Sequence, residues 1–176
     1  MNEGIAWLAV GRGYPGRIAF LGFPGLMIQP TGHLLIDPDR QEALIAELSA
    51  GSCAFFVAVF DEAEAPEGAF DDMTAALDRA GITILHRPIE DFGIPDPAFR
   101  AGWQRILPDL RRTLAEGGAI ALSCLAGLGR SGMMAAQLLV DCGWQPDAAV
   151  KAVRALCPEA IESDAQLRFL RGQPPA

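Results

Sequence analysis

Ser123-Cys124-Leu125-Ala126-Gly127-Leu128-Gly129-Arg130-Ser131-Gly132 is the stretch that decides the fold. It lies between a short apolar run, 119–122, and a strongly helical pattern, 133–140, which predicts a strand, a loop and a helix in succession. Cys124 and Arg130 stand at the two ends of the loop as a Cys-x5-Arg pair. Such a pair alone is weak evidence, but the loop glycines, the serine after the arginine and the strand-loop-helix setting make it specific.

This loop has the composition of a cradle for a phosphate dianion. Backbone N–H groups of a tight loop that opens a helix point inward, and the helix start adds partial positive charge. Arg130 can direct two N–H groups onto two phosphate oxygens, and the same positive field favours the nucleophilic thiolate of Cys124. Ser131 can donate a hydrogen bond to that sulfur. The expected phosphate-binding residues are Leu125, Ala126, Gly127, Leu128, Gly129 and Arg130.

Two other glycine-loop interpretations fit less well. Gly127, Gly129 and Gly132 match the dinucleotide-binding pattern, and Asp147 follows at a suitable distance. However, that acid should end a second strand, whereas Asp147 follows Pro146 and begins a helix. A nucleoside-triphosphate loop is excluded because the segment contains no Gly-Lys-Ser/Thr.

The rest of the chain alternates short apolar runs with amphipathic ones, which predicts an α/β fold in a single domain, 1–176. Helices are expected to begin at Asp37-Pro38 and Asp96-Pro97, because an N-capping acid followed by proline favours a helix start. The expected helices are 37–51, 70–80, 96–117, 133–140, 147–156 and 163–170; the expected inner strands are 54–60, 82–85 and 119–122; and the runs 5–10, 18–21 and 34–36 are expected as edge strands. Crossover helices make the central sheet mostly parallel, flanked by helices.

In such a sheet, ligands bind at the carboxyl ends of the strands. That rule brings three separate features to one edge: Asp61-Glu62 after the first inner strand, Glu90-Asp91 in the loop after the second, and Ser123-Cys124 after the third. We expect the reactive site there.

The chain resembles the cysteine-dependent protein tyrosine phosphatase superfamily, in its dual-specificity branch and most closely its kinase-associated phosphatases. The segments that carry this resemblance cover most of the chain: 21–25, 88–96, 124–132, 160–166 and 169–170. The resemblance implies a protein tyrosine phosphatase-like fold and a phosphocysteine intermediate on Cys124, with Arg130 binding the phosphoryl group. It also implies that Asp91 protonates the leaving oxygen and then activates water, which Gln166 helps to place.

Three acids compete for the role of general acid. Asp91 has the spacing from Cys124 that such phosphatases show, but Glu90 and Asp96 lie in the same loop region. Asp96 has a structural alternative as the N-cap before Pro97. One residue departs from the family pattern: Ser123 stands where the family usually carries His, so we expect weaker stabilisation of the thiolate.

Composition limits the partners. The formal charge is −8, the isoelectric point is near 4.7, and Lys151 is the single lysine, so neither nucleic acid nor an anionic membrane surface is an expected partner. No apolar run is long enough to span a membrane, and residues 1–4 do not form a secretion signal, so we expect a cytoplasmic protein. We expect reduced thiols that act as small buried apolar residues at Cys53, Cys142 and Cys157. With two histidines, no metal and no cofactor are expected.

The sequence therefore predicts a phosphomonoester hydrolase that acts on a phosphorylated protein or a small phosphomonoester. The variable positions of the loop contain no lysine, because they are Leu125, Ala126 and Leu128. Negative charge is added nearby by Asp61, Glu62 and Glu64, so polyanionic substrates are disfavoured. A phosphoprotein-binding pseudophosphatase is the alternative, because of Ser123. A sulfurtransferase or an arsenate reductase is a third hypothesis, which fits the acid loop and Gln166 less well.

Overall fold

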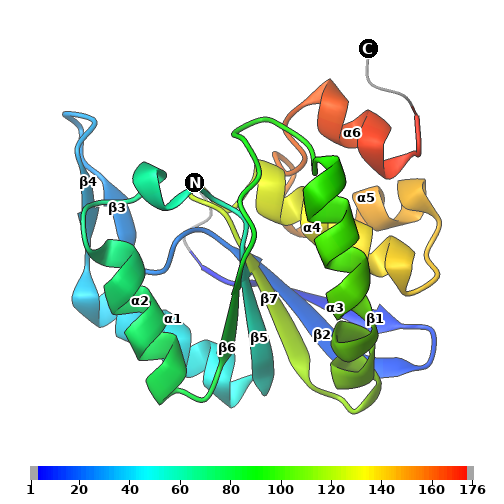
Figure 1. Ribbon diagram of the computed structural model, residues 1–176, viewed down its shortest axis with the longest axis horizontal. Coiled ribbons are helices and arrows are strands. Elements are labelled where there is room, and N and C mark those ends of the chain that lie inside the picture. The colour runs from blue at the N-terminus through cyan, green and yellow to red at the C-terminus, as the bar shows by residue number, and fades with distance from the viewer. Residues whose placement is uncertain (1–3, 174–176) are drawn as a thin grey trace.

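A five-stranded sheet with the order β1-β2-β7-β5-β6 runs through the centre of the computed structural model, which describes residues 4–173 (Figure 1). Its strands are β1 (Ala6–Gly11), β2 (Tyr14–Leu21), β5 (Cys53–Ala58), β6 (Thr83–His86) and β7 (Ala119–Ser123). Four neighbouring strands are parallel and β1 is antiparallel to β2. The mostly parallel α/β sheet expected from the sequence is thus confirmed. The expectation about a secretion signal depends on residues 1–3, which lie outside the described residues.

The N-terminal third differs from the expected edge strands in two respects. β2 lies inside the sheet, where it pairs with β1 on one side and in parallel with β7 on the other. The third run forms β4 (Leu34–Ile36), which pairs with β3 (Leu26–Ile28) in a separate two-stranded sheet. The prediction of an edge position for β2 was wrong because strand pairing between residues about a hundred positions apart leaves no local pattern in the sequence.

Helices cover both faces of the sheet, in two groups that lie to its left and right in Figure 1. One face carries α1 (Pro38–Ala50) and α2 (Ala69–Arg79); the other carries α3 (Pro97–Ala115), α4 (Gly129–Asp141), α5 (Pro146–Leu156) and α6 (Asp164–Leu170). Alternate residues of β7 serve the two cores: Ala119 and Ala121 pack with the α1–α2 side, and Ile120 and Leu122 with the α3–α6 side.

The two Asp-Pro pairs begin helices as expected. The Asp37 carboxylate accepts a hydrogen bond from the Arg40 backbone N–H at 3.0 Å, and Asp96 accepts one from Phe99 at 2.6 Å. In both helices the next residue is proline, which has no N–H to leave unpaired. α4 begins at Gly129, earlier than the apolar pattern from Met133 indicates, because the end of the reactive loop already forms its first turn.

Three further observations concern the cysteines, the helices and the side chains that can bind metal ions. All four cysteines are free thiols; burial raises the pKa of Cys53 to about 12 and that of Cys142 to about 11, so neither is a nucleophile at neutral pH. Within residues 4–173, no helix combines the length and hydrophobicity that crossing a membrane requires. The same residues contain no cluster of His, Cys, Asp or Glu side chains suited to a metal ion.

Candidate active site

The Cys124 sulfur lies at the carboxyl end of β7, inside the loop that leads into α4. It accepts a hydrogen bond from the Gly127 backbone N–H at 3.2 Å and lies 3.3 Å from the Ser131 hydroxyl oxygen. Both Cys124 and Ser131 are buried. The Gly127 N–H and the Ser131 hydroxyl thus both lie within hydrogen-bonding distance of the sulfur.

Gly22 and Phe23, which follow β2, pack against this loop and bind its backbone. Gly127 has φ +77°, and any Cβ on it would collide with the backbone of Gly22. The Ser123 hydroxyl donates to the Gly22 carbonyl at 3.1 Å, and the Phe23 N–H donates to the Leu125 carbonyl at 3.1 Å. Ser123 therefore helps to order the loop through its hydrogen bond to the backbone of Gly22, and its hydroxyl bonds there and not to the sulfur.

Arg130 lies in the first turn of α4 with only 3% of its side chain exposed. Its Nη1 and Nη2 atoms donate to the two carboxylate oxygens of Glu64 at 2.6 and 2.7 Å, and Nη1 also donates to the Ile89 carbonyl at 3.0 Å. Burial lowers the pKa of Arg130, but the Glu64 hydrogen bonds and the charges of Cys124, Glu64 and Asp91 outweigh it, and the pKa is raised. The buried Arg130 Nε has no hydrogen-bond partner among residues 4–173.

Glu64 is a site residue that the sequence reasoning placed only at the rim. It ends the short 3-10 helix η1 (Glu62–Glu64) after β5, and its side chain also accepts from the Asp61 N–H at 2.7 Å. Burial raises the pKa of Glu64, yet its hydrogen bond to Arg130 is among the effects that reverse this, and the pKa lies below its ordinary value. The sheet-edge rule put Asp61-Glu62 near the loop; it could not choose which acid of the turn reaches Arg130.

The three candidate acids occupy different positions. An Asp91 carboxylate oxygen lies 3.2 Å from Arg130 Nη2, and 59% of the Asp91 side chain is exposed. Asp96 caps α3, and the Glu90 side chain is exposed. Of the three acids, Asp91 is therefore the one that lies beside Arg130 in the reactive loop.

The start of α6 fastens the loop that carries Asp91. The fully buried Gln166 side chain donates to the Gly93 carbonyl at 3.3 Å and accepts from the Glu162 N–H at 3.0 Å. The Ser163 hydroxyl donates to the Phe92 carbonyl at 2.8 Å. Gln166 lies beside Gly129 as well. Both ends of its amide contact backbone groups, so in this structure it joins α6 to the acid loop.

Glu162 is a second residue that sequence reasoning missed. One of its carboxylate oxygens lies against Gly129, inside the loop expected to bind phosphate, and the Gly129 N–H favours the charged form of this carboxylate. No motif indicated this, because the contact depends on how the 157–163 segment returns to α4.

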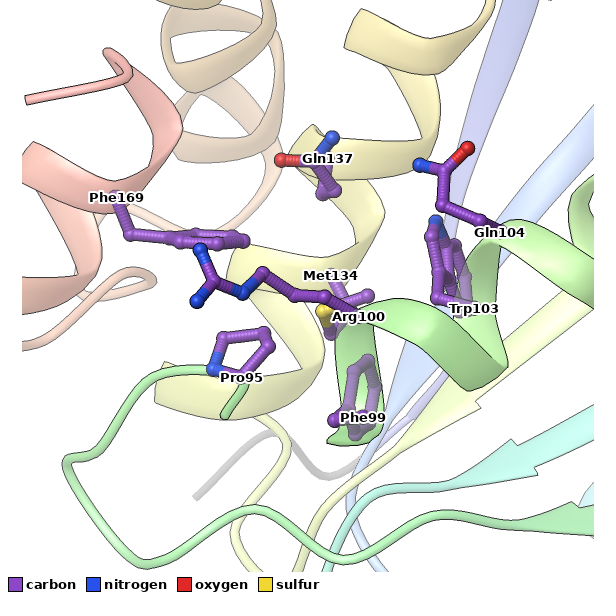
Figure 2. A pocket seen from close by; sticks show the side chains of 8 residues that line it. All are labelled: Pro95, Phe99, Arg100, Trp103, Gln104, Met134, Gln137 and Phe169. Atoms are coloured by element: carbon purple, nitrogen blue, oxygen red, sulfur yellow. The ribbon is translucent and has the colours of Figure 1, made fainter. Parts of the chain in front are cut away.

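A separate cavity of about 160 Å³ lies behind the acid loop, between α3, α4 and α6 (Figure 2). Its walls are mainly apolar, with Pro95 from the acid loop, Phe99 and Trp103 from α3, and Phe169 from α6; Arg100 extends toward Phe169. None of the residues around the Cys124 sulfur lines it, so the chemistry belongs to the loop and not to this cavity.

Several known proteins are similar to this chain. PRL-1 phosphatase of Drosophila melanogaster is 32% identical over 102 residues, 58% of this chain and 57% of that protein. Protein tyrosine phosphatase type IVA 2 of Mus musculus is 31% identical over 96 residues, 54% of this chain and 56% of that protein. The matched region thus spans little more than half the length of these relatives.

The fold is similar to that of solved phosphatases. The structure of kinase associated phosphatase has a TM-score of 0.74 and 22% identity, covering 97% of this chain and 93% of that one. Tk-PTP in its active form has a TM-score of 0.65 and 24% identity, covering 90% and 94%. A protein tyrosine phosphatase-like α/β fold is therefore confirmed.

A family model agrees with these relatives and with the loop geometry. The model described as "Polymorphic toxin system, DSP-PTPase phosphatase" matches residues 48–144, which run from the end of α1 past the end of α4 and include the Cys124 loop and Asp91. Because this match covers more than half of the chain, the protein belongs to the DSP-PTPase phosphatase family of polymorphic toxin systems.

Proposed function

We propose that the chain is a cysteine-dependent phosphatase domain, 1–176, that hydrolyses phosphomonoesters on proteins or small molecules without a metal or other cofactor. The observation that carries the proposal is the convergence of the Cys124 sulfur, the Ser131 hydroxyl, Arg130 and Asp91 on one loop. The unpartnered Arg130 Nε supports it, because a buried N–H without an acceptor calls for one and a phosphate oxygen would supply it.

The proposed reaction has two steps. The Cys124 thiolate attacks phosphorus, the bond to the leaving oxygen breaks, and Asp91 gives that oxygen a proton. Asp91, now a carboxylate, then takes a proton from water as the water attacks the phosphocysteine, which releases phosphate and the thiolate. Arg130 and the backbone N–H groups of residues 125–130 bind the phosphoryl oxygens in both steps. Gln166 helps to place the water.

A phosphoprotein-binding module without turnover is the second candidate. Two features favour it: Ser123 stands before the nucleophile and bonds to Gly22 rather than to the loop sulfur, and both Nη atoms of Arg130 are held by Glu64. The similarity to PRL-1 phosphatase and to protein tyrosine phosphatase type IVA 2 favours the hydrolase. A reactive thiolate is preserved in a reducing compartment, which is why we propose the cytoplasm as its location.

The deciding experiment is hydrolysis of p-nitrophenyl phosphate from about pH 5 to about pH 8 with EDTA present. We expect turnover in the wild type and a hydrolysis rate reduced by about a thousandfold or more in Cys124→Ser. In Asp91→Asn we expect the rate to fall by about a hundredfold or more and the acid-dependent limb of the pH–rate profile to disappear. A wild type that binds phosphate without hydrolysing it would instead support the binding module. Turnover retained in Cys124→Ser would contradict the cysteine mechanism.

A further inference from the structure

The Glu162 carboxylate lies beside Gly129, a residue of the loop expected to bind phosphate. One of its oxygens lies directly beside the Gly129 Cα, where a Cβ would collide with it, and the Gly129 N–H favours the charged form of Glu162. Gly129 belongs to the Cys124–Arg130 loop and is the first residue of α4. An N–H at that position is one of the donors expected to hold the phosphoryl group.

The backbone around Glu162 is held in place by the rest of the protein. Ile161 has φ +63°, an unfavourable conformation for a β-branched residue. Arg154 on α5 donates to the carbonyls of Ala160 and Ile161 at 3.0 and 2.9 Å, and the Ile161 N–H donates to the Leu128 carbonyl at 3.3 Å. These contacts fix the backbone position from which the Glu162 side chain extends.

Among residues 4–173, two charged groups act on this carboxylate. Asp91 approaches from the acid loop and repels it, whereas Arg130 on α4 attracts it, though Arg130 is already paired with Glu64. Arg154, on α5, donates to backbone carbonyls beside it. Burial first and the Asp91 charge second raise the pKa of Glu162, against the Gly129 hydrogen bond and the Arg130 charge. Glu162 is thus already easier to protonate than an ordinary glutamate.

We propose that Glu162 competes with the phosphoryl group for the Gly129 N–H, so that binding of a dianion in the loop is coupled to uptake of a proton by Glu162. The inference rests on the proposed function, in that it takes the loop to be the anion site. A dianion beside a carboxylate disfavours the charged form of that carboxylate, because like charges at close range raise the cost of ionisation. Glu162 then sets both the affinity for phosphate and its dependence on pH.

Sulfate is the suitable probe, because its charge stays constant over the working range and it cannot be hydrolysed. Its binding is measured by calorimetry from about pH 5 to about pH 8, in pairs of buffers with different ionisation enthalpies, which counts the protons taken up. The proteins are the full wild-type chain, Glu162→Gln and the control Glu159→Gln, which removes one exposed charge from the same segment. Circular dichroism verifies that each variant is folded.

The wild type and Glu159→Gln are expected to take up a proton on binding sulfate and to lose affinity by about tenfold as the pH rises across this range. Glu162→Gln is expected to bind about tenfold more tightly near pH 7, with little proton uptake. The proton count in the wild type stands as a test even if the variant fails to fold.

Two results would overturn the inference: no proton uptake by the wild type, or the same affinity and proton count in Glu162→Gln as in Glu159→Gln. Absence of any sulfate binding would overturn it too, together with the anion site itself. Proton-coupled binding of sulfate in a chain that does not hydrolyse p-nitrophenyl phosphate would support the inference and contradict the hydrolase proposal, so the two failures are distinguishable.

Discussion

At the scale of single residues, the site is a balance between one buried arginine and several carboxylates. Arg130 meets Glu64 through two hydrogen bonds and Asp91 through a longer contact. The sequence motif predicted Cys124 and Arg130 because seven neighbouring residues carry the pattern. It could not predict Glu64 or Glu162, since each reaches the loop through tertiary packing and neither has a neighbour that marks it.

Glu64→Gln is expected to lower the free energy of unfolding by about 1–2 kcal/mol at neutral pH, because it weakens the pair that holds a buried guanidinium. The pKa of Glu64 is lowered on folding, so its contribution is present above its unfolded pKa and disappears as the pH falls through the folded value. Urea unfolding near pH 7 and at about pH 3 measures both limits. Glu62→Gln, at an exposed position of the same turn, is the control. A difference that persists in acid would contradict this account of the pair.

Ser131→Ala is expected to reduce kcat for p-nitrophenyl phosphate by about tenfold to a hundredfold, since a hydrogen bond to a charged sulfur is lost inside a buried site. Sulfate binding should change little, because the hydroxyl contacts the sulfur and not the loop's N–H groups. Steady-state kinetics and calorimetry on the same preparation separate the two effects. An unchanged kcat would show that the Ser131 contact does not assist the reaction.

At the scale of elements, helix boundaries were the most predictable part. Asp37-Pro38 and Asp96-Pro97 mark their helices locally, through a side-chain acceptor and a residue with preset φ. β3 and η1, each three residues long, had no comparable local signal. The acid loop was placed correctly after β6, but its attachment to α6 depends on the long-range Gln166 and Ser163 contacts.

The two aspartates near the acid loop are expected to respond differently to substitution. Asp96→Ala removes the N-cap of α3 and should cost about 1 kcal/mol of stability while leaving the pH profile of hydrolysis unchanged. Asp91→Asn should leave the stability nearly unchanged and alter the pH profile of hydrolysis. Thermal unfolding and pH–rate profiles of both variants check this. Loss of the acid-dependent limb in Asp96→Ala would make Asp96 the general acid.

Gln166→Leu should loosen the acid loop, because the Gly93 carbonyl and the Glu162 N–H each lose a partner. We expect a loss of stability of about 1–3 kcal/mol and faster hydrogen exchange at the amides of 88–95. Gln104→Leu, at an exposed position on α3, serves as the control. Unchanged exchange in the acid loop of Gln166→Leu would show that this side chain does not fasten it.

At the scale of the whole molecule, the sheet order explains how residues far apart in sequence form one site. β5, β6 and β7 end at the same edge and deliver Glu64, Asp91 and Cys124 to it, while the exit of β2 supports the loop through Gly22. The alternation of helices and parallel strands made the edge predictable. The inner position of β2 could not be predicted, because it depends on pairing with a strand far away in the sequence. The chain's net charge of −8 works against the binding of polyanionic substrates.

The central claim is that Cys124 forms a covalent bond to phosphorus. The most direct measurement is acid quenching of the wild type during turnover of p-nitrophenyl phosphate, followed by mass spectrometry of its peptides. We expect one added phosphoryl group on the peptide that contains Cys124, increased in Asp91→Asn because hydrolysis of the phosphocysteine needs that carboxylate, and absent in Cys124→Ser. Turnover without this adduct, or an adduct on another residue, would contradict the account.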